Sequence, residues 1–510
     1  MGRRSMRVEK AILIIGLLSL SVFLASFEIK PTMAWEGTVY IRADGSIDPP
    51  TAPIQRNGEV YTLTATIYTE EYGGDGIVIE RSNIILEGAG YGVQGPFYDG
   101  VGVWLSYIQN ITVRDMRVRG YVTGVDLLRC SNVNVTGNTI GGNINGVECH
   151  FTENITIAQN TIYQSEEVYN VFFDTDTGSQ ISNNNLSQAL LGIRLYNCTH
   201  ENIYGNNITA ITNVGIQLTS SNHTSTYDNI IEDSKNGIGL DYYSAYNVIF
   251  DNQIKTCNAA GIRFENSSTN SILRNTIVQN AVGIIGQFSD SNIITENNVT
   301  ANTGEGICLN YSSSNNIVDN NLIDNQYGVR LRSTSSSMVH GNTVTSNALY
   351  GIGLDSHSSL NDIHENTVQQ SYYGILIFGL CPNNTIYHNN FIDNTDQANS
   401  MSSNTWDNGC EGNYWSNYNG TDTDGDGVGD TNLPWENVDN YPLMGPYWIP
   451  ADINHDTIVN ILDVVKITGA YGATPLDPTW NPHADISKPF EKIDILDVVL
   501  CTGHYGEKRD

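Results

Sequence analysis

Short stretches of alternating apolar and polar residues recur along most of this chain at a nearly constant interval. Between residues 124 and 377, a glycine followed by Ile or Val, a variable residue and another apolar residue returns every 22 to 24 positions, as in Gly192-Ile-Arg-Leu195. The phrase is missing once, near Asn170. Self-similarity at this period is typical of a solenoid, in which each repeat forms one coil and buries its apolar face against its neighbours.

Each period contains three apolar alternations separated by Ser, Asn, Asp and Gly, for example at residues 306–309, 316–318 and 320–323. This pattern predicts short strands joined by tight turns, and no part of the period has helical spacing. Asparagines recur in phase with the strands, as in Asn275-Thr-Ile and Asn320-Asn-Leu. Stacked in register, they are expected to hydrogen-bond along the rod as an amide ladder.

These Gly-Ile-x-Leu and Asn-Asn-x-Ile phrases resemble those of the right-handed parallel β-helix family known as NosD-type periplasmic copper-binding repeats. The resemblance covers about residues 60–445 and implies a right-handed solenoid of about 12 or more coils. The family name also implies copper. The chain has only seven Met and ten His with no evident His or Met cluster, so its composition does not favour copper.

Charge and targeting signals limit the functions open to the chain. Its 510 residues include 24 Lys plus Arg against 55 Asp plus Glu, for a formal net charge of -31. Nucleic acids and anionic membranes are therefore poor partners, whereas divalent cations are good ones. Residues 1–34 combine a basic start, an apolar run and a plausible cleavage site, which predicts a secretory signal peptide, with an uncleaved N-terminal membrane anchor as the alternative. We expect a secreted or cell-surface protein.

Segments outside the regular repeats are expected to cap the rod, because an open solenoid end exposes unpaired strand edges. We assign residues 35–115 to an N-terminal cap and first coils, 116–400 to the repeats, and 401–448 to a closing segment. The closing segment has carboxylates at alternating positions around glycines, which predicts a Ca²⁺ loop, with an acidic surface turn as the alternative. The proposed ligands are Asp422, Asp424, Asp426 and Asp430.

Residues 451–507 contain a duplication with a spacing of 34 residues, in which Ile461-Leu-Asp-Val-Val matches Ile495-Leu-Asp-Val-Val. Each copy has the apolar spacing of an amphipathic helix that ends at glycine. Oxygen donors upstream of the first copy follow the ligand order of an EF-hand loop. These proposed Ca²⁺ ligands are Asp452, Asn454, Asp456, the carbonyl of Ile458, Asn460 and Asp463.

This doubled loop and helix resembles a type I dockerin, a small α-helical EF-hand-like module. The resemblance implies docking to a cohesin-type domain, with Ile461, Leu462, Ile495 and Leu496 near the contact. Two departures are evident: Thr457 stands where the loop usually has glycine, and the second loop, starting at Asp485, is one residue too long and lacks its middle carboxylates. An intramolecular Ca²⁺-stabilised cap is the alternative.

The repeat that lacks the glycine phrase is where we expect surface chemistry. Aligning Asn170-Val-Phe-Phe173 between the flanking phrases places Glu148, Phe172 and Arg194 in one outward column and His150, Asp174 and Tyr196 in the next. A His or Tyr base beside an Arg that neutralises a uronate is what abstraction of a sugar C5 proton requires. The candidate catalytic residues are Glu148, His150, Asp174, Asp176, Arg194 and Tyr196; ordinary solvated surface is the alternative.

Tyr327, Tyr350 and Tyr373 precede the glycine in three successive coils and are expected to stack. An exposed stack could receive sugar rings, but simple strand parity gives these tyrosines the direction of the buried Val or Ile two residues later and favours an internal stack. We conclude that the chain is an exported, Ca²⁺-binding β-helix that binds polysaccharide or glycoconjugate. The alternatives are a polysaccharide lyase, C5-epimerase or glycoside hydrolase, and a purely structural surface rod.

Overall fold

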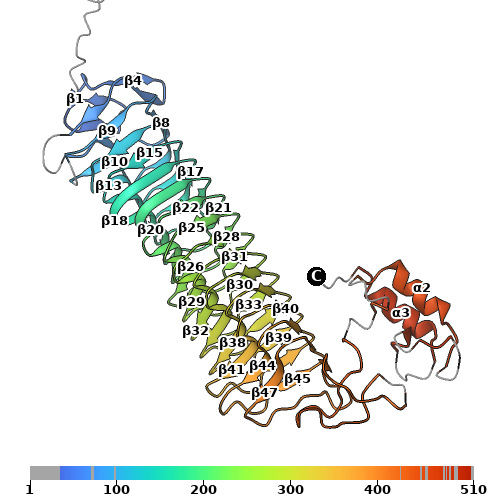
Figure 1. Cartoon of the computed structure of the whole chain (residues 1–510). Coiled ribbons are helices and arrows are strands. Elements are labelled where there is room, and N and C mark those ends of the chain that lie inside the picture. The colour runs from blue at the N-terminus through green and yellow to red at the C-terminus, as the bar shows by residue number, and fades with distance from the viewer. Residues whose placement is uncertain are drawn as a thin grey trace, which may run out of the picture.

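The chain winds into an elongated right-handed parallel β-helix followed by a pair of short helices (Figure 1). The computed structural model describes residues 35–69, 74–96, 99–424, 427–447, 451–453, 458–474, 477, 479–481, 484–487 and 492–506. The expected signal peptide or anchor at residues 1–34 therefore lies outside the described residues. None of the helices in these described ranges combines the length and apolar character needed to cross a membrane.

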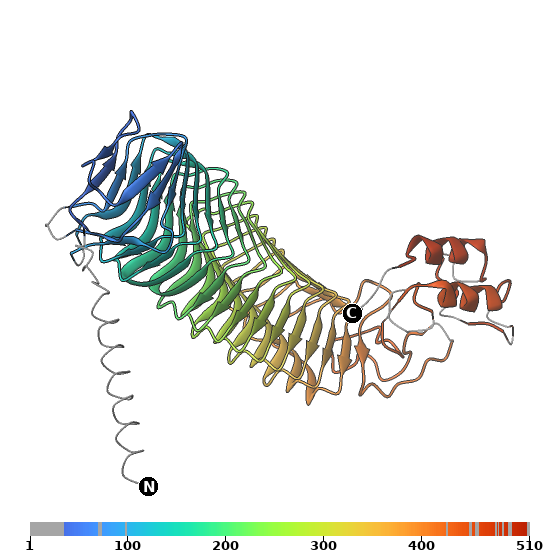
Figure 2. The ribbon, with the colours of Figure 1, turned by 90° about the horizontal axis from the view of Figure 1, so that it is seen from above.

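Every regular coil contributes one strand to each of three parallel stacks, so the predicted three-strand repeat is confirmed. The first stack contains the Gly-Ile-x-Leu strands: β2 (Val39–Ile41), β7 (Ile77–Ile79), β10 (Val101–Ser106), β13 (Thr123–Leu128), β16 (Asn145–His150), β18 (Thr161–Asp174), β20 (Asn185–Tyr196), β23 (Val214–Thr219), β26 (Asn236–Asp241), β29 (Ala260–Glu265), β32 (Val282–Gln287), β35 (Glu305–Asn310), β38 (Tyr327–Arg332), β41 (Tyr350–Asp355), β44 (Tyr373–Ile377) and β47 (Asp396–Ser400). Figure 2 shows these coils side by side along the rod.

The second stack forms a separate 16-stranded sheet. It comprises β4 (Ile54–Asn57), β5 (Val60–Leu63), β8 (Ile84–Glu87), β11 (Gln109–Arg114), β14 (Ser131–Thr136), β17 (Glu153–Ala158), β19 (Gln180–Ser182), β21 (Asn202–Tyr204), β24 (Ser225–Tyr227), β27 (Val248–Phe250), β30 (Ser271–Leu273), β33 (Ile293–Thr295), β36 (Asn316–Val318), β39 (Met338–His340), β42 (Asp362–His364) and β45 (Thr385–Tyr387). At its N-terminal end β4 pairs antiparallel with β5, and this hairpin covers the edge of the sheet.

The third stack joins the first through two long strands, β18 and β20, which pass from one stack into the other without a break. Its other strands are β1 (Trp35–Glu36), β6 (Ile67–Tyr68), β9 (Gly92–Gln94), β12 (Arg117–Arg119), β15 (Thr139–Gly141), β22 (Asn207–Thr209), β25 (Ile230–Glu232), β28 (Gln253–Lys255), β31 (Thr276–Val278), β34 (Asn298–Thr300), β37 (Asn321–Ile323), β40 (Thr343–Thr345), β43 (Thr367–Gln369), β46 (Asn390–Ile392) and β48 (Tyr414–Trp415). The short β3 (Ile47–Asp48) pairs antiparallel with β2.

The glycine of each repeat is required by close packing rather than by an unusual φ angle. At Gly237 an added Cβ would lie 2.5 Å from the carbonyl oxygen of Gly261 and 2.5 Å from a methyl group of Ile254. The glycine therefore points inward, and so does the isoleucine after it, Ile238, which is fully buried. Two consecutive inward residues break the simple alternation of a strand at this corner.

The asparagine ladder predicted from the sequence is confirmed. From Asn138 to Asn413, one buried asparagine per coil donates its side-chain amide to the oxygen of the next, as between Asn275 and Asn297 at 3.0 Å. The same amide also reaches a backbone carbonyl, at Ile249 for Asn275. Burial of an amide is tolerated because all of its donors and acceptors are used.

Three buried tryptophans close the C-terminal end of the rod. Trp415 stacks on Phe391 with ring centroids 4.5 Å apart and on Trp435 at 3.9 Å, while Trp406 lies 5.9 Å from Trp415. All three tryptophans are buried in the same core as the coils. Their rings cover the last apolar layer, which would otherwise face water.

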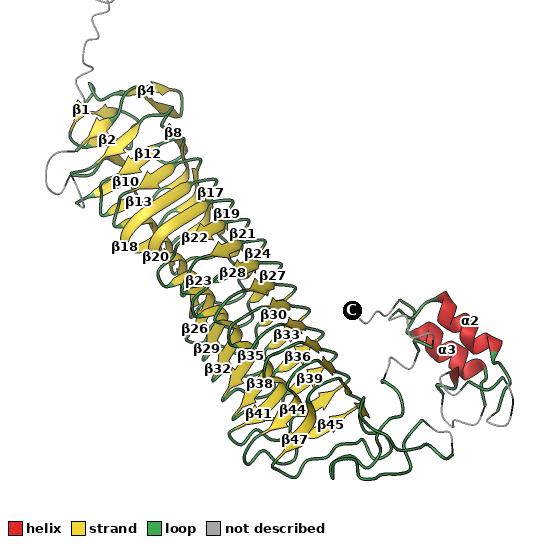
Figure 3. Ribbon diagram, viewed as in Figure 1, coloured by secondary structure: helices red, strands yellow, loops and turns green. Residues whose placement is uncertain are grey.

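The duplicated tail forms α2 (Ile461–Gly469) and α3 (Ile495–Gly503), the red helices of Figure 3. Each helix starts with a capping box, with Asn460 and Asp494 as the N-cap residues. The two copies exchange equivalent hydrogen bonds: Gly472 N–H donates to the carbonyl of Ile493, and Gly506 N–H donates to that of Val459, both at 2.8 Å. The tail also has an apolar core of its own, which includes Ile467 and Cys501.

Candidate functional site: the first stack and its corner

The strand register around the missing glycine phrase is the one that the sequence predicts. Glu148 pairs with Phe172 and Phe172 with Arg194, while His150 pairs with Asp174 and Asp174 with Tyr196. The two columns lie on the outer surface of the first stack, since their side chains are half-buried or exposed. The long strands β18 and β20 position the columns where the rod has no turn between two of its stacks.

His150 and Asp174 form a polar pair on this surface. The imidazole Nδ1 of His150 lies 3.6 Å from the carboxylate of Asp174, and each side chain is about one quarter exposed. Phe172 contacts the edge of the His150 ring, with centroids 5.5 Å apart. A carboxylate that orients an imidazole in this way supports proton transfer by the histidine.

Arg194 is surrounded by aromatic rings rather than by acids. Its Nη1 donates to the hydroxyl of Tyr169 at 3.0 Å, and its guanidinium carbon lies 5.7 to 5.9 Å from the rings of Tyr169, Phe172 and Tyr196. Among the described residues no carboxylate forms an ion pair with Arg194. The guanidinium is thus held in place by neutral groups and can accept an anionic partner from outside.

Other arginines of the same column are already neutralised. Arg263 forms ion pairs with Asp241 at 2.8 Å and Glu265 at 2.7 Å. Arg330 bridges Glu305 at 2.8 Å and Asp355 at 2.7 Å. Arg263 and Arg330 therefore have carboxylate partners and Arg194 has none among the described residues, although all three arginines occupy equivalent positions.

The carboxylate of Glu148 has polar neighbours in the preceding coil. Its carboxylate accepts a hydrogen bond from Thr123 at 2.7 Å. Asp126 lies one coil away in the same column, and burial, with a smaller contribution from Glu148, raises the pKa of Asp126 to about 6. Sequence reasoning missed Asp126 and Tyr169, although both follow from extending the predicted columns by one coil or one position.

The expectation that Asp176 lies beside this surface is wrong. Asp176 is 2% exposed and occupies an inward corner position, where it accepts a hydrogen bond from Thr152 of the preceding coil. Its buried partner is Glu201, also 2% exposed, which accepts the N–H of Ser179 at 2.7 Å. Burial is the main cause that raises the pKa of both acids, to about 6 for Asp176 and about 9 for Glu201.

The internal stacking predicted for Tyr327, Tyr350 and Tyr373 is also wrong. All three are half-buried on the outer surface, and the ring of Tyr350 occupies the space over Gly353, where a Cβ would lie 2.3 Å away. Simple strand parity fails because the intervening glycine and the next residue both face inward. The tyrosines, together with Arg330, Leu349, Asp355, Leu376 and Phe378, line a surface pocket.

A row of exposed aromatic side chains follows the first stack along its corner. In six coils the residue directly after the Gly-phrase strand is aromatic, and its exposed fraction ranges from 48% to 68%. We call these residues the corner aromatics: Tyr107, Phe151, Tyr242, Phe288, Tyr311 and Phe378. Phe288 and Tyr311 stack with centroids 5.1 Å apart. Arg129 lies between Tyr107 and Phe151, within 5.6 Å of both rings.

Three aspartates of the closing segment lie close together. One carboxylate oxygen from each of Asp422, Asp424 and Asp430 lies within 4.8 Å of the others. Asp430 also accepts from the N–H and hydroxyl of Thr423, and these hydrogen bonds lower the pKa of Asp430. Asp426 lies outside the described residues.

Buried carboxylates gather at the start of both tail helices. Asp452 and Asp463 are 2% and 0% exposed in the first copy, and Asp485 and Asp497 are 4% and 0% exposed in the second. Among the described residues neither carboxylate oxygen of Asp485 has a hydrogen-bond partner, and burial and Asp497 raise the pKa of Asp485 to about 6. A bound cation would satisfy such a group, so the surroundings of Asp485 fit Ca²⁺. Asn454 and Asp456 lie outside the described residues.

The remaining predicted tail residues have defined positions. Asn460 caps α2, and its side-chain amide donates to the carbonyl of Ile458 at 2.9 Å. The side chains proposed to contact a partner are exposed by 52% to 57%; they are Ile461, Leu462, Ile495 and Leu496. Equivalent exposed apolar residues on both helices form the kind of surface that a partner protein covers.

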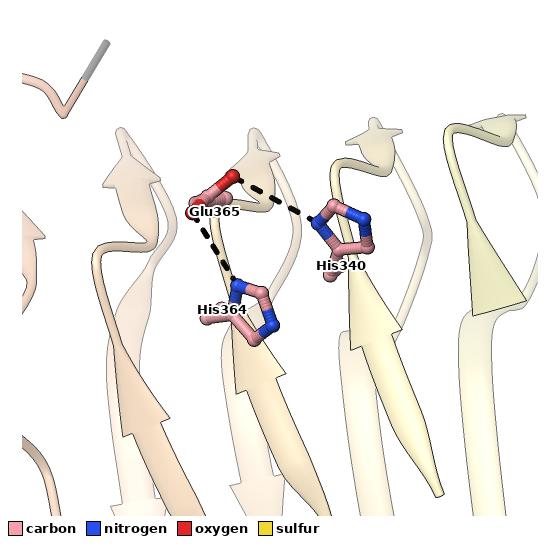
Figure 4. Close-up of side chains that lie close together, drawn as sticks. All are labelled: His340, His364 and Glu365. Atoms are coloured by element: carbon pink, nitrogen blue, oxygen red, sulfur yellow. Dashed lines mark ion pairs between the residues drawn. The ribbon is translucent and has the colours of Figure 1, made fainter. Parts of the chain in front are cut away.

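Composition alone missed a histidine cluster on the second stack. Figure 4 shows His340 and His364 on adjacent coils, with the carboxylate of Glu365 facing both rings. The two histidines are 24 residues apart in sequence and become neighbours because β39 and β42 pair in register. The solenoid period is the only sequence signal that could have revealed this cluster.

Three solved structures illustrate what the chain is similar to. Among solved structures, the chain is similar to the tailspike protein of E. coli bacteriophage HK620 in complex with a pentasaccharide, at 12% identity over 68% of this chain and 71% of that chain, with a TM-score of 0.43. A double mutant of the periplasmic alginate epimerase AlgG gives 15% identity, 67% and 84% coverage and a TM-score of 0.40. The A-module of Azotobacter vinelandii mannuronan C-5 epimerase AlgE4 gives 14%, 63%, 90% and 0.38.

No curated protein matches the sequence significantly. The family described as "Periplasmic copper-binding protein (NosD)" matches three overlapping stretches, residues 61–238, 210–334 and 287–420. Together these matches run through the coils of the rod and span more than half of the chain. The chain therefore belongs to the NosD family.

Proposed function

We propose that this protein is exported and binds polysaccharide along the first stack and its corner, while its dockerin-like tail attaches it to a partner through Ca²⁺-dependent folding. The observation that carries the proposal is the row of corner aromatics. Isolated exposed aromatic residues are common on protein surfaces, but five at the same corner position of a repeat, with Phe378 one position earlier in its coil, form an organised surface.

Packing does not account for these rings. Five of the six have φ angles between 49° and 58°, a left-handed conformation in which an asparagine is less strained than an aromatic residue. Asn197 and Asn266 occupy equivalent corners in other coils. Since the rings remain exposed, they contribute little to the core. Flat aromatic faces suit sugar rings, which pack their C–H groups against such surfaces.

The adjoining columns add polar groups that could orient a sugar chain. The Arg194 site and the pocket around Tyr350 are seven strand spacings apart, or about 34 Å along the rod. A ligand that contacts both must be a polymer rather than a monosaccharide. Neutral segments suit the Tyr350 pocket, because Arg330 is already paired with Glu305 and Asp355.

The tail supplies the proposed attachment. Asp452, Asn454, Asp456, Asn460 and Asp463, with the carbonyl of Ile458, would hold Ca²⁺ in the first copy; Asp485 and Asp497 would contribute in the second. Ca²⁺ would offset the repulsion between buried carboxylates and so stabilise the module. The exposed residues Ile461, Leu462, Ile495 and Leu496 would then contact a cohesin-type domain. A periplasmic, secreted or cell-surface location is consistent with the predicted signal at residues 1–34 and with the family description.

Affinity electrophoresis against neutral and uronate-containing polysaccharides tests glycan binding. The double variant Phe288→Asn and Tyr311→Asn should bind about tenfold more weakly, since two stacking surfaces are lost while asparagine fits the corner. Leu360→Asn is the matched control, because Leu360 is 62% exposed at a different corner with φ of 58°. Absence of retention by every polysaccharide, or equal loss in the control, would contradict the proposal.

A second candidate function, favoured by the lack of an ion pair between Arg194 and any described side chain, is modification of a uronate-containing polysaccharide. His150 or Tyr196 would remove the proton from sugar C5, and Arg194 would stabilise the negative charge that moves onto the carboxylate. Return of a proton to the opposite face would give the C5 epimer. Breakage of the C4–oxygen bond, with protonation of the leaving oxygen, would instead give an unsaturated sugar.

The two outcomes of this chemistry have separate signals. Unsaturated products absorb ultraviolet light, whereas epimerisation introduces solvent deuterium at C5. Either activity should disappear in Arg194→Ala and in the double variant His150→Ala and Tyr196→Ala but survive in Arg263→Ala, which removes an arginine from the same column that is already paired. The enzyme hypothesis fails if the wild-type protein produces neither signal, or if Arg263→Ala reduces turnover as much as Arg194→Ala.

A further inference from the structure

His340, His364 and Glu365 form a half-buried cluster on the outer surface of the second stack, away from the strands that carry the proposed glycan surface. His340 ends β39 and His364 ends β42, so the parallel pairing of these strands stacks the two imidazoles with centroids 4.8 Å apart and an interplanar angle of 24°. Glu365 directly follows His364 at the turn, with φ of 56°. Adjacent coils thus contribute three donor groups to one position (Figure 4).

The donor atoms face one another. Nδ1 of His340 lies 3.8 Å from one oxygen of Glu365, and Nδ1 of His364 lies 3.5 Å from the other. These separations are longer than a typical N–H···O hydrogen bond. Two ligands of one tetrahedral zinc ion, each at about 2.0 to 2.2 Å from the metal, are about 3.3 Å apart. The cluster therefore has nearly the spacing of ligands around a shared ion.

Neighbouring side chains hold His364 in an orientation suited to ligation. Its Nε2 lies 4.0 Å from the carboxylate of Asp362, which favours a proton on Nε2 and leaves the Nδ1 lone pair toward Glu365. Tyr387 stacks on the ring at 5.1 Å, on the coil opposite to His340. Only 13% of the His364 side chain is exposed. Such outer partners typically orient a metal-binding histidine.

We propose that His340, His364 and Glu365 bind one divalent transition metal ion of the Zn²⁺ or Cu²⁺ type. Two imidazole nitrogens and one carboxylate oxygen suit these ions better than Ca²⁺ or Mg²⁺, which prefer oxygen ligands alone. Three protein ligands leave a coordination position for water or another small ligand. The bound ion would offset the negative charge of Glu365 and join two successive coils.

The chain contains a matched control for this site. His200 and His223 also stack on adjacent coils, with centroids 5.1 Å apart and an interplanar angle of 9°. His200 Nδ1 lies 2.9 Å from the hydroxyl of Thr199, and no carboxylate joins this pair in a candidate metal cluster of the described residues. Only the pair His340 and His364 has Glu365 and Asp362 beside it, and it is half-buried, whereas His200 and His223 are exposed.

Isothermal titration of the full chain, stripped of metal and then saturated with Ca²⁺, tests the proposal with Zn²⁺ and separately with Cu²⁺. One site should be lost in the double variant His340→Ala and His364→Ala and in Glu365→Gln. Asp362→Asn should weaken affinity about tenfold, as loss of an orienting partner does. The double variant His200→Ala and His223→Ala should bind normally.

Electron paramagnetic resonance of the Cu²⁺ complex gives an independent readout that does not depend on the double variant folding. The wild-type spectrum should show coupling to two nitrogen ligands, and Glu365→Gln should alter it. The proposal is overturned if neither ion binds, if Cu²⁺ has no two-nitrogen signal, or if the site persists in Glu365→Gln. It is equally overturned if removal of His200 and His223 abolishes the site.

Discussion

Asp439 terminates the asparagine ladder at Asn413. The backbone N–H of Asn413 donates to the carboxylate of Asp439 at 2.8 Å, and the indole N–H of Trp415 donates to the same oxygen at 2.8 Å. The N–H of Tyr441 donates to the second oxygen at 2.9 Å. Each asparagine of the ladder donates hydrogen bonds to the next coil, so the last asparagine requires a partner that only accepts hydrogen bonds. A carboxylate meets this requirement, whereas another asparagine does not.

Asp439→Asn should lower the free energy of unfolding by about 1 to 3 kcal/mol, because the amide would turn an NH₂ group toward existing donors. Thermal unfolding monitored by tryptophan fluorescence measures the loss, since Trp406, Trp415 and Trp435 surround the site. Asp228→Asn, an exposed corner substitution of the same chemical type, should leave the transition unchanged. A melting temperature equal to that of Asp228→Asn would show that acceptor-only chemistry is not required.

The repeat phrase at residues 237–240 contains one glycine that close packing requires, Gly237, and one that it does not, Gly239. Gly237→Ala should destabilise the rod by about 1 to 3 kcal/mol, since its Cβ would contact Gly261 and Ile254 at 2.5 Å inside the core. Gly239→Ala, two residues later, should be tolerated because the nearest atom to its Cβ, a methyl carbon of Val214, is 3.3 Å away. Urea denaturation of both variants measures the difference. Equal stability would mean that the inward corner can expand.

The sequence predicts the coil period, the three strands and the asparagine ladder well because these features repeat, and each coil provides evidence for the others. It also places Glu148 beside Phe172 and His150 beside Asp174, since register follows directly from the period. The direction of a side chain is harder to predict where the alternating pattern is locally interrupted. The tyrosines before the glycine face outward because two consecutive residues face inward at that corner. A prediction that assumes strict alternation of inward and outward residues misses this change of direction.

An inward-facing residue is equally difficult to recognise when its type differs from that of the equivalent residues in neighbouring coils. The sequence suggests that Asp176 lies at the surface, yet it occupies the inward position that holds Thr152 and Cys198 in neighbouring coils. Likewise, His340 and His364 are too far apart in sequence to form a local motif. Both cases require the column of equivalent residues to be followed along the rod rather than the linear sequence.

The buried acids Asp176 and Glu201 should make stability depend on pH. Glu201 has an ordinary pKa of 4.5 and a folded-state pKa raised to about 9 by burial and by Asp176. The unfolded chain therefore releases this proton at lower pH than the folded chain does. Stability from Glu201 is fully present below pH 4.5 and declines until the pH passes about 9.

Glu201→Gln should remove that decline, because glutamine resembles the protonated acid and can still donate to Asp176 and accept from Ser179. The variant should match the wild type near pH 5 and unfold at a higher temperature near pH 9. Melting temperatures across this range provide the measurement, with the exposed substitution Glu153→Gln as control. Parallel pH profiles for the wild type and Glu201→Gln would show that the two acids do not share a proton.

Removal of Ca²⁺ should unfold the tail while the rod remains intact. The described tail residues form a small apolar core of their own, which offers little buried surface to offset the repulsion among the buried carboxylates. Addition of a chelator should reduce the helical circular dichroism of α2 and α3 and leave the strand signal unchanged. Ca²⁺ should restore the helical signal.

Asp463→Ala tests the first copy and Asp497→Ala the second, because each removes a fully buried carboxylate from one helix start. Asp477→Ala is the control, because Asp477 lies between the copies and its side chain hydrogen-bonds only Thr474 among the described residues. If the helical signal survives the chelator, the capping boxes and the apolar core are sufficient to fold the tail, and the cation has no structural role there.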